Sequence, residues 1–382
     1  TDNAISIETG AAATAVNLSA GNLTDTVTID ATDLAQDVAL TINASGAAAA
    51  GTVNITNLVG DVVLTNATTG TIGIAAVDAV NNGISVTGSA ANITVTTLAN
   101  GDTMTVTAQT GSFTGTAIAG TGIFNVTGGA GAQTISTGAG ADIITGGAGG
   151  DALTGGAGND TYVYTGTADL NASESITEAG GAGTDRIKVT GTTDFANLTA
   201  ASFDEIDELE VTGAFTSTFT GVQLTGETIS LIGATGSVQD IDVTATDSGT
   251  TDLSGITAGT NFTSGTDTIT ITGSDNGEVI TGTGAADTIT TGNGADEVRA
   301  ATGALVGADT VTGGTGTDTL TITAADTGIV DANFTNVTNF ETLALTGAST
   351  ATLGTEAGQA GFVTGTGTIK TGAGATSITA DN

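Results

Sequence analysis

The sequence predicts an all-β protein built as a parallel β-helix or β-roll solenoid, and three observations point to this fold class. Short segments with alternating apolar and polar residues follow one another between residues 5 and 126, each bounded by Gly, Asn or Asp. Four nine-residue units run without a gap through residues 128–163. The composition is rich in Thr, Val and Ile, with 60 glycines and only 3% aromatic residues, which suits strands around a thin interior.

The alternation in the N-terminal third is typical of strands with one buried face. In Thr26-Val27-Thr28-Ile29-Asp30 every second side chain is apolar, as a strand with one inward face requires. The same pattern occurs at residues 38–42, 53–55, 62–64, 84–86, 93–95 and 104–106. Two interpretations remain open, a solenoid continuous with the nine-residue units or a separate β-sandwich. The even spacing and the lack of a linker favour the solenoid.

The four units read GGAGAQTIS, TGAGADIIT, GGAGGDALT and GGAGNDTYV. Glycine adopts backbone conformations that a Cβ disfavours, so the first six positions can form a tight turn with inward carbonyl groups. The last three positions then extend as a strand. Position eight supplies one inward apolar side chain per unit, namely Ile135, Ile144, Leu153 and Tyr162.

Position six carries the residues that point to calcium. Two units complete one coil, so residues 18 positions apart should stack, which places Asp142 above Asp160 and Gln133 above Asp151. Carboxylates from two stacked turns and glycine carbonyls together supply the roughly six to eight oxygen ligands that Ca²⁺ prefers. We therefore expect Ca²⁺ at the Asp142/Asp160 pair. Gln133 removes one negative ligand, so the Gln133/Asp151 pair should be weaker or empty.

Further copies of the unit extend the set of candidate ligands. GGAGTDRIK at residues 180–188 is a complete match, and a second, less regular region covers residues 262–321. The last unit, residues 371–379, has Thr376 at position six and is expected to be a coil without strong calcium binding. The predicted metal ligands are eight aspartates and six glycines: Asp142, Asp151, Asp160, Asp185, Asp287, Asp296, Asp309, Asp318, Gly138, Gly140, Gly147, Gly149, Gly156 and Gly158.

Composition excludes several classes of function. With 4 basic and 40 acidic residues the net charge is -36, which disfavours nucleic acid and anionic lipid and favours divalent cations. The absence of Cys and His excludes disulfides, thiol nucleophiles, Ser–His triads and most zinc sites. The acidic cluster at residues 204–210 is more simply a solvated strand or turn than a catalytic pair. We expect no catalytic residues, no enzymatic activity and no membrane insertion.

An internal duplication organises the second half of the chain. The pattern L-x-(V/L)-T-G occurs at residues 209–213 and 343–347, 134 residues apart. The domains expected from all these features are a Thr/Val/Ile-rich solenoid (1–127), a first calcium-binding β-roll (128–190), a β-rich insertion of the first duplicated unit (191–261), a second β-roll (262–321), and the second duplicated unit with terminal coils (322–382). A β-sandwich-like form stays open for the insertions.

The nine-residue units and the duplicated segments resemble RTX proteins, and among them bacterial surface-layer (S-layer) proteins of the Caulobacter type. The specific repeats cover under a third of the chain. The resemblance implies a secreted, calcium-ordered structural protein, exported by a type I system and assembling on the bacterial cell surface. Millimolar extracellular calcium would fill even weak sites.

The expected partner is the chain itself, in a lattice, sheath or filament, with cell-surface polysaccharide as a second candidate. Three alternatives remain open. They are the repeat segment of an RTX adhesin or biofilm-matrix protein, the non-catalytic tail of an RTX hydrolase, and a β-helix lyase.

Overall fold

The computed structural model describes residues 5–12, 14–18, 26–33, 40–43, 52–58, 62–65, 71–76, 83–87, 92–98, 103–109, 111–115, 122–170, 173–178, 183–263, 266–300, 309–323, 328–346, 349–362, 367–371 and 377–380. The chain divides into two compact units. Unit 1 comprises Thr1–Lys188 and Asn197–Ile206, and unit 2 comprises Val189–Ala196 and Asp207–Asn382. The terminal nine-residue copy with Thr376 falls largely outside the described residues.

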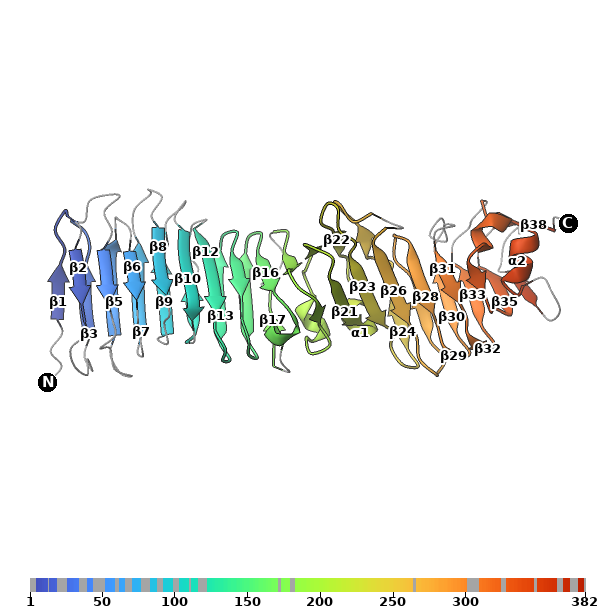
Figure 1. Ribbon diagram of the computed structural model, residues 1–382, viewed down its shortest axis with the longest axis horizontal. Coiled ribbons are helices and arrows are strands. Elements are labelled where there is room, and N and C mark those ends of the chain that lie inside the picture. Colours follow the sequence, from blue (N-terminus) through green and yellow to red (C-terminus); the bar gives the residue numbers. More distant parts are fainter. Residues whose placement is uncertain are drawn as a thin grey trace. The chain divides into compact units, whose positions relative to one another are not determined.

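Unit 1 consists of two sheets, each made of parallel strands, and consecutive strands of the chain belong alternately to one sheet and the other (Figure 1). The odd-numbered sheet contains β1 (Ile5–Glu8), β3 (Thr26–Asp30), β5 (Thr52–Leu58), β7 (Thr71–Ala76), β9 (Asn92–Thr97), β11 (Phe113–Gly115), β13 (Thr134–Ala139), β15 (Ala152–Ala157) and β17 (Ser175–Ile176). The even-numbered sheet contains β2 (Thr14–Asn17), β4 (Leu40–Asn43), β6 (Val62–Thr65), β8 (Gly83–Thr87), β10 (Thr103–Gln109), β12 (Ile123–Gly128), β14 (Ile143–Thr145), β16 (Thr161–Tyr164) and β18 (Arg186–Val189). Two 3₁₀ turns, Thr167–Asp169 and Ala200–Ser202, lie in the connections.

Alternation decides which side chains enter the space between the two sheets. In β3, Val27 and Ile29 are fully buried, while Thr26, Thr28 and Asp30 are half-buried. The parallel register then stacks the buried side chains in columns, one of which runs through Val27, Val53, Ile72, Ile93, Phe113, Ile135, Leu153 and Ile176. Burial of each large apolar side chain contributes roughly 1.5–3 kcal/mol. The described strands before residue 127 therefore continue into the nine-residue units in one register, which confirms the predicted solenoid and makes the β-sandwich alternative wrong for them.

Unit 2 is also built from parallel strands. One sheet contains β19 (Thr193–Asp194), β21 (Thr216–Thr220), β23 (Asp240–Thr244), β26 (Thr268–Thr272), β28 (Asp287–Thr290), β31 (Thr310–Thr312) and β34 (Val337–Thr338). A second contains β24 (Thr250–Asp252), β27 (Val279–Thr281), β30 (Glu297–Ala300), β33 (Thr319–Ile322), β35 (Thr342–Leu345) and β37 (Thr368–Thr371). Shorter groups are β20 (Glu208–Val211) with β22 (Ser230–Ile232) and β25 (Thr257–Ala258), β29 (Asn293–Gly294) with β32 (Thr315–Gly316), and β36 (Thr350–Leu353) with β38 (Ser377–Ala380).

Helix is scarce in unit 2. Among the described residues of unit 2, the helical segments are α1 (Gly221–Leu224), α2 (Thr355–Gln359) and the 3₁₀ turn Asp331–Phe334. Within the described parts of the chain, no helix is long and apolar enough to cross a membrane.

The two copies of the internal duplication have the same order of elements. In the first copy β20 is followed by β21 and α1, and in the second β35 is followed by β36 and α2. Leu209 and Leu343 are buried at equivalent points of β20 and β35. The helices begin at Gly221 and Thr355, which are again 134 residues apart. The two duplicated segments are thus built from the same kind of parallel strand as the repeats, each with a short helix at one turn.

Candidate calcium centres

The glycine turns bring successive coils of the first array close together. Gly147 and Gly156, both at position two, have φ angles of 90° and 107°, in the left-handed region that favours glycine. A Cβ on Gly156 would collide with the carbonyl oxygen of Gly138 in the preceding coil. Of the six predicted glycine ligands, Gly140, Gly147, Gly149 and Gly158 lie in these turns, and Gly138 and Gly156 lie near the ends of β13 and β15. Larger residues here would separate the coils and the carbonyl groups with them.

The position-six aspartates connect one coil to the next. The backbone N–H of Asp142 donates to Oδ1 of Asp160 at 2.8 Å, and the N–H of Asp160 donates to Oδ1 of Asp185 at 2.9 Å. Asp142 in turn accepts the N–H of Phe124 at 2.8 Å. The structure therefore stacks Asp142 on Asp160 as expected and adds Asp185 to the same column. We name Phe124, Asp142, Asp160 and Asp185 the first carboxylate ladder.

The second oxygen of each aspartate is left without a hydrogen bond. Asp142, Asp151 and Asp160 are fully buried, and Oδ2 of each has no partner among the described residues. In the units of Asp151 and Asp160 the glycine at position one makes room for this oxygen, because a Cβ on Gly146 would lie 2.6 Å from Oδ2 of Asp151. Position one of the Asp142 unit is Thr137. Leaving a buried polar atom unpaired costs about 1–3 kcal/mol, and more for a charged group. A bound cation would remove that cost. Hard carboxylate oxygens beside a glycine turn fit Ca²⁺.

A second ladder lies in the turns that lead into the odd-numbered sheet. The N–H of Gln133 donates to Oδ1 of Asp151 at 2.7 Å, and the N–H of Asp151 donates to Oε2 of Glu174, also at 2.7 Å. Glu174 is 2% exposed, and the hydroxyl of Tyr164 donates to its Oε1 at 3.2 Å. Glu174 comes from the insertion after the first array. It takes the place that an aspartate would have in the next regular unit.

The side chain of Gln133 forms hydrogen bonds within its own turn. Its amide Nε2 donates to the carbonyl of Gly131, and its Oε1 accepts the N–H of Gly129 at 3.2 Å. The side chain therefore bridges two backbone groups of its own turn. This arrangement supports the prediction that the Gln133/Asp151 site is weak or empty.

Replacing Gln133 with Asp is expected to create an additional calcium site. The substitution would remove the amide that bridges the turn and place a carboxylate above Asp151, as in the Asp142/Asp160 pair. Isothermal titration calorimetry should then show one more bound Ca²⁺ than the wild type. Asn at position 133, which keeps a neutral amide, serves as the matched control, and an extra site in that variant would contradict the charge argument.

Unit 2 contains a ladder of the same kind. The N–H of Glu278 donates to Oδ1 of Asp296 at 2.9 Å, and the N–H of Asp296 donates to Oδ1 of Asp318 at 2.9 Å. The N–H of Asp318 donates to Oε2 of Glu341 at 2.8 Å. Asp296 and Asp318 are buried, and neither Oδ2 has a partner among the described residues. These two aspartates have the geometry of the first ladder.

Asp287 and Asp309 form a different arrangement. The N–H of Asp287 donates to Oδ1 of Asp309 at 3.1 Å, which continues the pattern. Both carboxylate oxygens of Asp287, however, accept hydrogen bonds of 2.7 Å from Thr283, one from its N–H and one from its hydroxyl. The local hydrogen bonds already satisfy this carboxylate, so the geometry favours Asp296 and Asp318 over Asp287 as calcium ligands.

Three acidic members of the ladders are absent from the predicted set of ligands. Glu174 and Glu341 lie outside the nine-residue units, and Glu278 stands at position six of a degenerate unit. A sequence pattern shorter than the nine-residue unit is present at all three residues. Every ladder acid is followed two residues later by a buried apolar residue, as in Asp142-x-Ile144, Glu174-x-Ile176 and Glu341-x-Leu343. The acid ends a turn, and the apolar residue is the first inward side chain of the following strand.

Burial and like charge make the ladders electrostatically unfavourable without a cation. Burial raises the pKa of Asp160 to about 7, and the neighbouring Asp142, Glu178 and Asp185 contribute to the same rise. Burial likewise raises the pKa of Glu174 to about 8 and that of Asp318 to about 6. The chain has only 4 basic residues, and one of them, Arg299, forms an ion pair with Glu297 at 3.0 Å. With 40 acidic residues in the chain, most of the neutralising charge must therefore come from solvent cations or protons.

The acidic segment at residues 204–210 has no such arrangement. Asp204 and Glu205 are exposed, and Glu208 and Glu210 lie on the half-buried positions of β20, alternating with the buried Leu209. This is the alternation of an ordinary strand with one solvated face.

Comparison with known proteins agrees with this geometry. The family model described as the RTX calcium-binding nonapeptide repeat, in four copies, matches residues 127–162, 272–304 and 305–321. No curated protein and no solved structure gives a significant match to the chain. The chain thus contains RTX calcium-binding repeats on a parallel β-solenoid, and Ca²⁺ is their expected ligand. Proteins with such repeats are typically secreted.

Proposed function

We propose that this protein is a calcium-stabilised structural protein of the bacterial cell exterior that assembles with copies of itself into a surface layer, sheath or filament. The observation that carries the proposal is the double use of the buried acids. In both ladders of unit 1 and the ladder of unit 2, one carboxylate oxygen holds the backbone of the preceding coil. The other oxygen of Asp142, Asp151, Asp160, Asp296 and Asp318 is available for a cation. These acids build a scaffold, so a non-enzymatic role is part of the proposal.

A regular outer surface supports repeated contacts between copies. In unit 2 the parallel register aligns a row of outward threonines, Thr220, Thr244, Thr272, Thr290, Thr312 and Thr338, along the sheet of β21 to β34. Neighbouring strands lie about 4.8 Å apart, so each coil presents the same hydroxyl and methyl groups at that interval. A surface that repeats with each coil can meet an identical surface in register.

Charge makes that assembly dependent on calcium. Subunits of net charge -36 repel one another, and divalent counterions allow acidic surfaces to approach. Calcium would thus act twice, within the glycine turns and between subunits. Location at the cell surface, export by a type I system and attachment through polysaccharide belong to the same proposal, and the RTX repeats support secretion.

Negative-stain electron microscopy tests the proposal. In millimolar Ca²⁺ the purified chain is expected to form sheets or filaments, and these should dissolve when a chelator is added. Readdition of Ca²⁺ should restore them. Mg²⁺ serves as the matched control, since it demands a smaller octahedral site and keeps its own water ligands. Particles that stay monodisperse in Ca²⁺ at high protein concentration would contradict self-assembly and leave a monomeric binding module as the function.

A further inference from the structure

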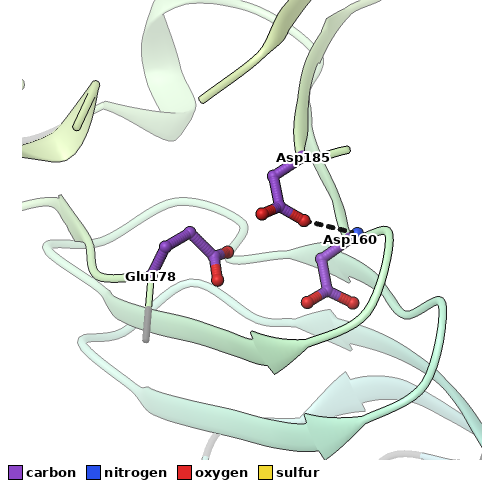
Figure 2. A group of neighbouring side chains, drawn as sticks. All are labelled: Asp160, Glu178 and Asp185. Carbon is purple, nitrogen blue, oxygen red and sulfur yellow. Dashed lines mark hydrogen bonds between the residues drawn. The ribbon is translucent and has the colours of Figure 1, made fainter. Parts of the chain in front are cut away.

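We propose that Asp160, Glu178 and Asp185 form a three-carboxylate calcium site that fills before the sites of the regular nine-residue units. The inference rests on the calcium-stabilised scaffold proposed above and names the cation-binding group at the point where the regular array ends. Figure 2 shows the three carboxylate groups turned toward a common space. One oxygen from each lies within 4.8 Å of the others. Ca²⁺ binds its oxygens at about 2.3–2.6 Å, so two ligands of one ion lie at most about 5 Å apart. The three oxygens therefore fit one ion.

A separate observation indicates that the group is incomplete without a ligand. Asp160 is fully buried, and its Oδ2 has no hydrogen-bond partner among the described residues. Its Oδ1 is already used by the N–H of Asp142. Asp185 is 5% exposed and places one oxygen on the N–H of Asp160. A cation would satisfy the remaining oxygen of Asp160.

Glu178 distinguishes this site from the others in the array. It lies in the connection from β17 to β18, outside every nine-residue unit, and its carboxylate accepts hydrogen bonds from the hydroxyl of Tyr162 and from the N–H of Gly156, the latter at 3.4 Å. The same hydroxyl accepts the N–H of Gly155 at 2.7 Å, which fixes its orientation. Tyr162 stands at position eight, where the other three units have aliphatic side chains. The hydroxyl is thus present in the unit that faces Glu178, and it positions that carboxylate.

The site lies where a longer coil follows the regular array, so a bound cation would connect the two. Asp142 and Asp160 are 18 residues apart, whereas Asp160 and Asp185 are 25 apart, because the insertion lengthens this coil. A longer connection costs more conformational entropy to order. A cation held by Asp160 from the array and by Glu178 and Asp185 from the longer coil would fasten that coil to the array. Affinity in calcium sites rises with the number of charged ligands, so three carboxylates are expected to bind more tightly than the two of the Asp142/Asp160 pair.

Tyrosine-sensitised terbium luminescence on the full chain tests the site. Tb³⁺ replaces Ca²⁺ at oxygen sites and emits when a neighbouring tyrosine is excited, and the chain has 2 tyrosines and no tryptophan. Glu178→Gln should weaken the tightest Tb³⁺ and Ca²⁺ binding step by roughly tenfold, because one charged ligand is lost. Glu8→Gln, at an exposed glutamate of β1, is the matched control and should leave binding unchanged.

A second variant keeps all three carboxylates. Tyr162→Phe removes the hydroxyl beside Glu178 and the nearest sensitiser, so the emission that accompanies the first binding step should be largely lost. Unchanged emission in Tyr162→Phe, or unchanged Tb³⁺ and Ca²⁺ affinities in Glu178→Gln, would overturn the site. Circular dichroism at saturating Ca²⁺ should show the same strand content in both variants and the wild type. Chelator-sensitive sheets or filaments in these samples would show that the proposed function holds even where the site fails.

Discussion

Replacing Asp142 and Asp160 together by alanine should abolish the calcium site between them, remove one ligand from the Asp160/Glu178/Asp185 site and loosen residues 128–163. Each substitution removes the acceptor for a buried backbone N–H of the preceding coil, those of Phe124 and Asp142, at about 1–3 kcal/mol each. Together the two substitutions also remove the unpartnered Oδ2 atoms of Asp142 and Asp160. The stabilisation from bound Ca²⁺ is then lost, which amounts to about 2.7 kcal/mol when free calcium is 100 times the dissociation constant. Calorimetry should report fewer bound ions, and hydrogen exchange should become faster across the array.

Asparagine variants separate the two effects. Asp142→Asn with Asp160→Asn keeps an oxygen acceptor for each backbone N–H but removes the charge, so calcium binding should fall while most of the calcium-free stability remains. Asp33→Ala, at an exposed aspartate in unit 1, should change neither property. An unchanged number of bound Ca²⁺ ions in the double alanine variant would contradict the pairing of Asp142 with Asp160.

The calcium-free protein should lose stability as the pH rises from about 4 to about 8. The folded pKa of Asp160 is raised from 3.8 to about 7, that of Glu174 from 4.5 to about 8, and that of Asp318 from 3.8 to about 6. The folded chain therefore holds protons that the unfolded chain has released, and stability present below pH 4 is lost as the pH passes through the folded values. The three pKa values shift in the same direction, so the three carboxyl groups add to the same loss of stability.

Calcium should reverse this dependence, because the cation replaces the protons on the same carboxylates. Thermal unfolding in chelator should give midpoints that fall between pH 4 and pH 8, whereas midpoints in Ca²⁺ should hold or rise over the same range. Binding at pH 6 should release protons, which a pH-stat or calorimetry in two buffers would detect. Glu174→Gln should flatten the slope in chelator. A calcium-free midpoint that rises steadily from pH 5 to pH 8 would contradict the raised pKa values.

The regular parts of the fold could be predicted because two periods are written directly in the sequence. Alternation fixed the buried face of strands such as β3, and the nine-residue period fixed which residues stack, as Asp142 does on Asp160. The same logic extended the solenoid to residues before 127, where no glycine turn marks the coils. A parallel register with one inward face leaves few other arrangements for segments of this length.

The irregular parts of the sites could not be predicted from spacing. Glu174 is 23 residues from Asp151 and Glu341 is 23 from Asp318, so a search at intervals of 18 passes over both. Insertions lengthen a turn without moving the strand that follows, and sequence distance then no longer equals distance along the solenoid. Glu178 has no periodic signal of any kind. Its relation to Asp160 and Asp185 depends on how the longer connection folds back.

The hydrogen bonds of the carboxylate ladders have a direction. Each carboxylate serves the backbone of the coil that precedes it in the chain, as Asp185 serves Asp160 and Asp160 serves Asp142. A coil is therefore complete only after its successor has folded against it. The two ends of a growing solenoid are therefore not equivalent, whichever end of the chain leaves a secretion pore first. A coil added on the C-terminal side supplies the carboxylate acceptor for the backbone N–H of the coil before it. A coil added on the N-terminal side donates its backbone N–H to a carboxylate that is already in place.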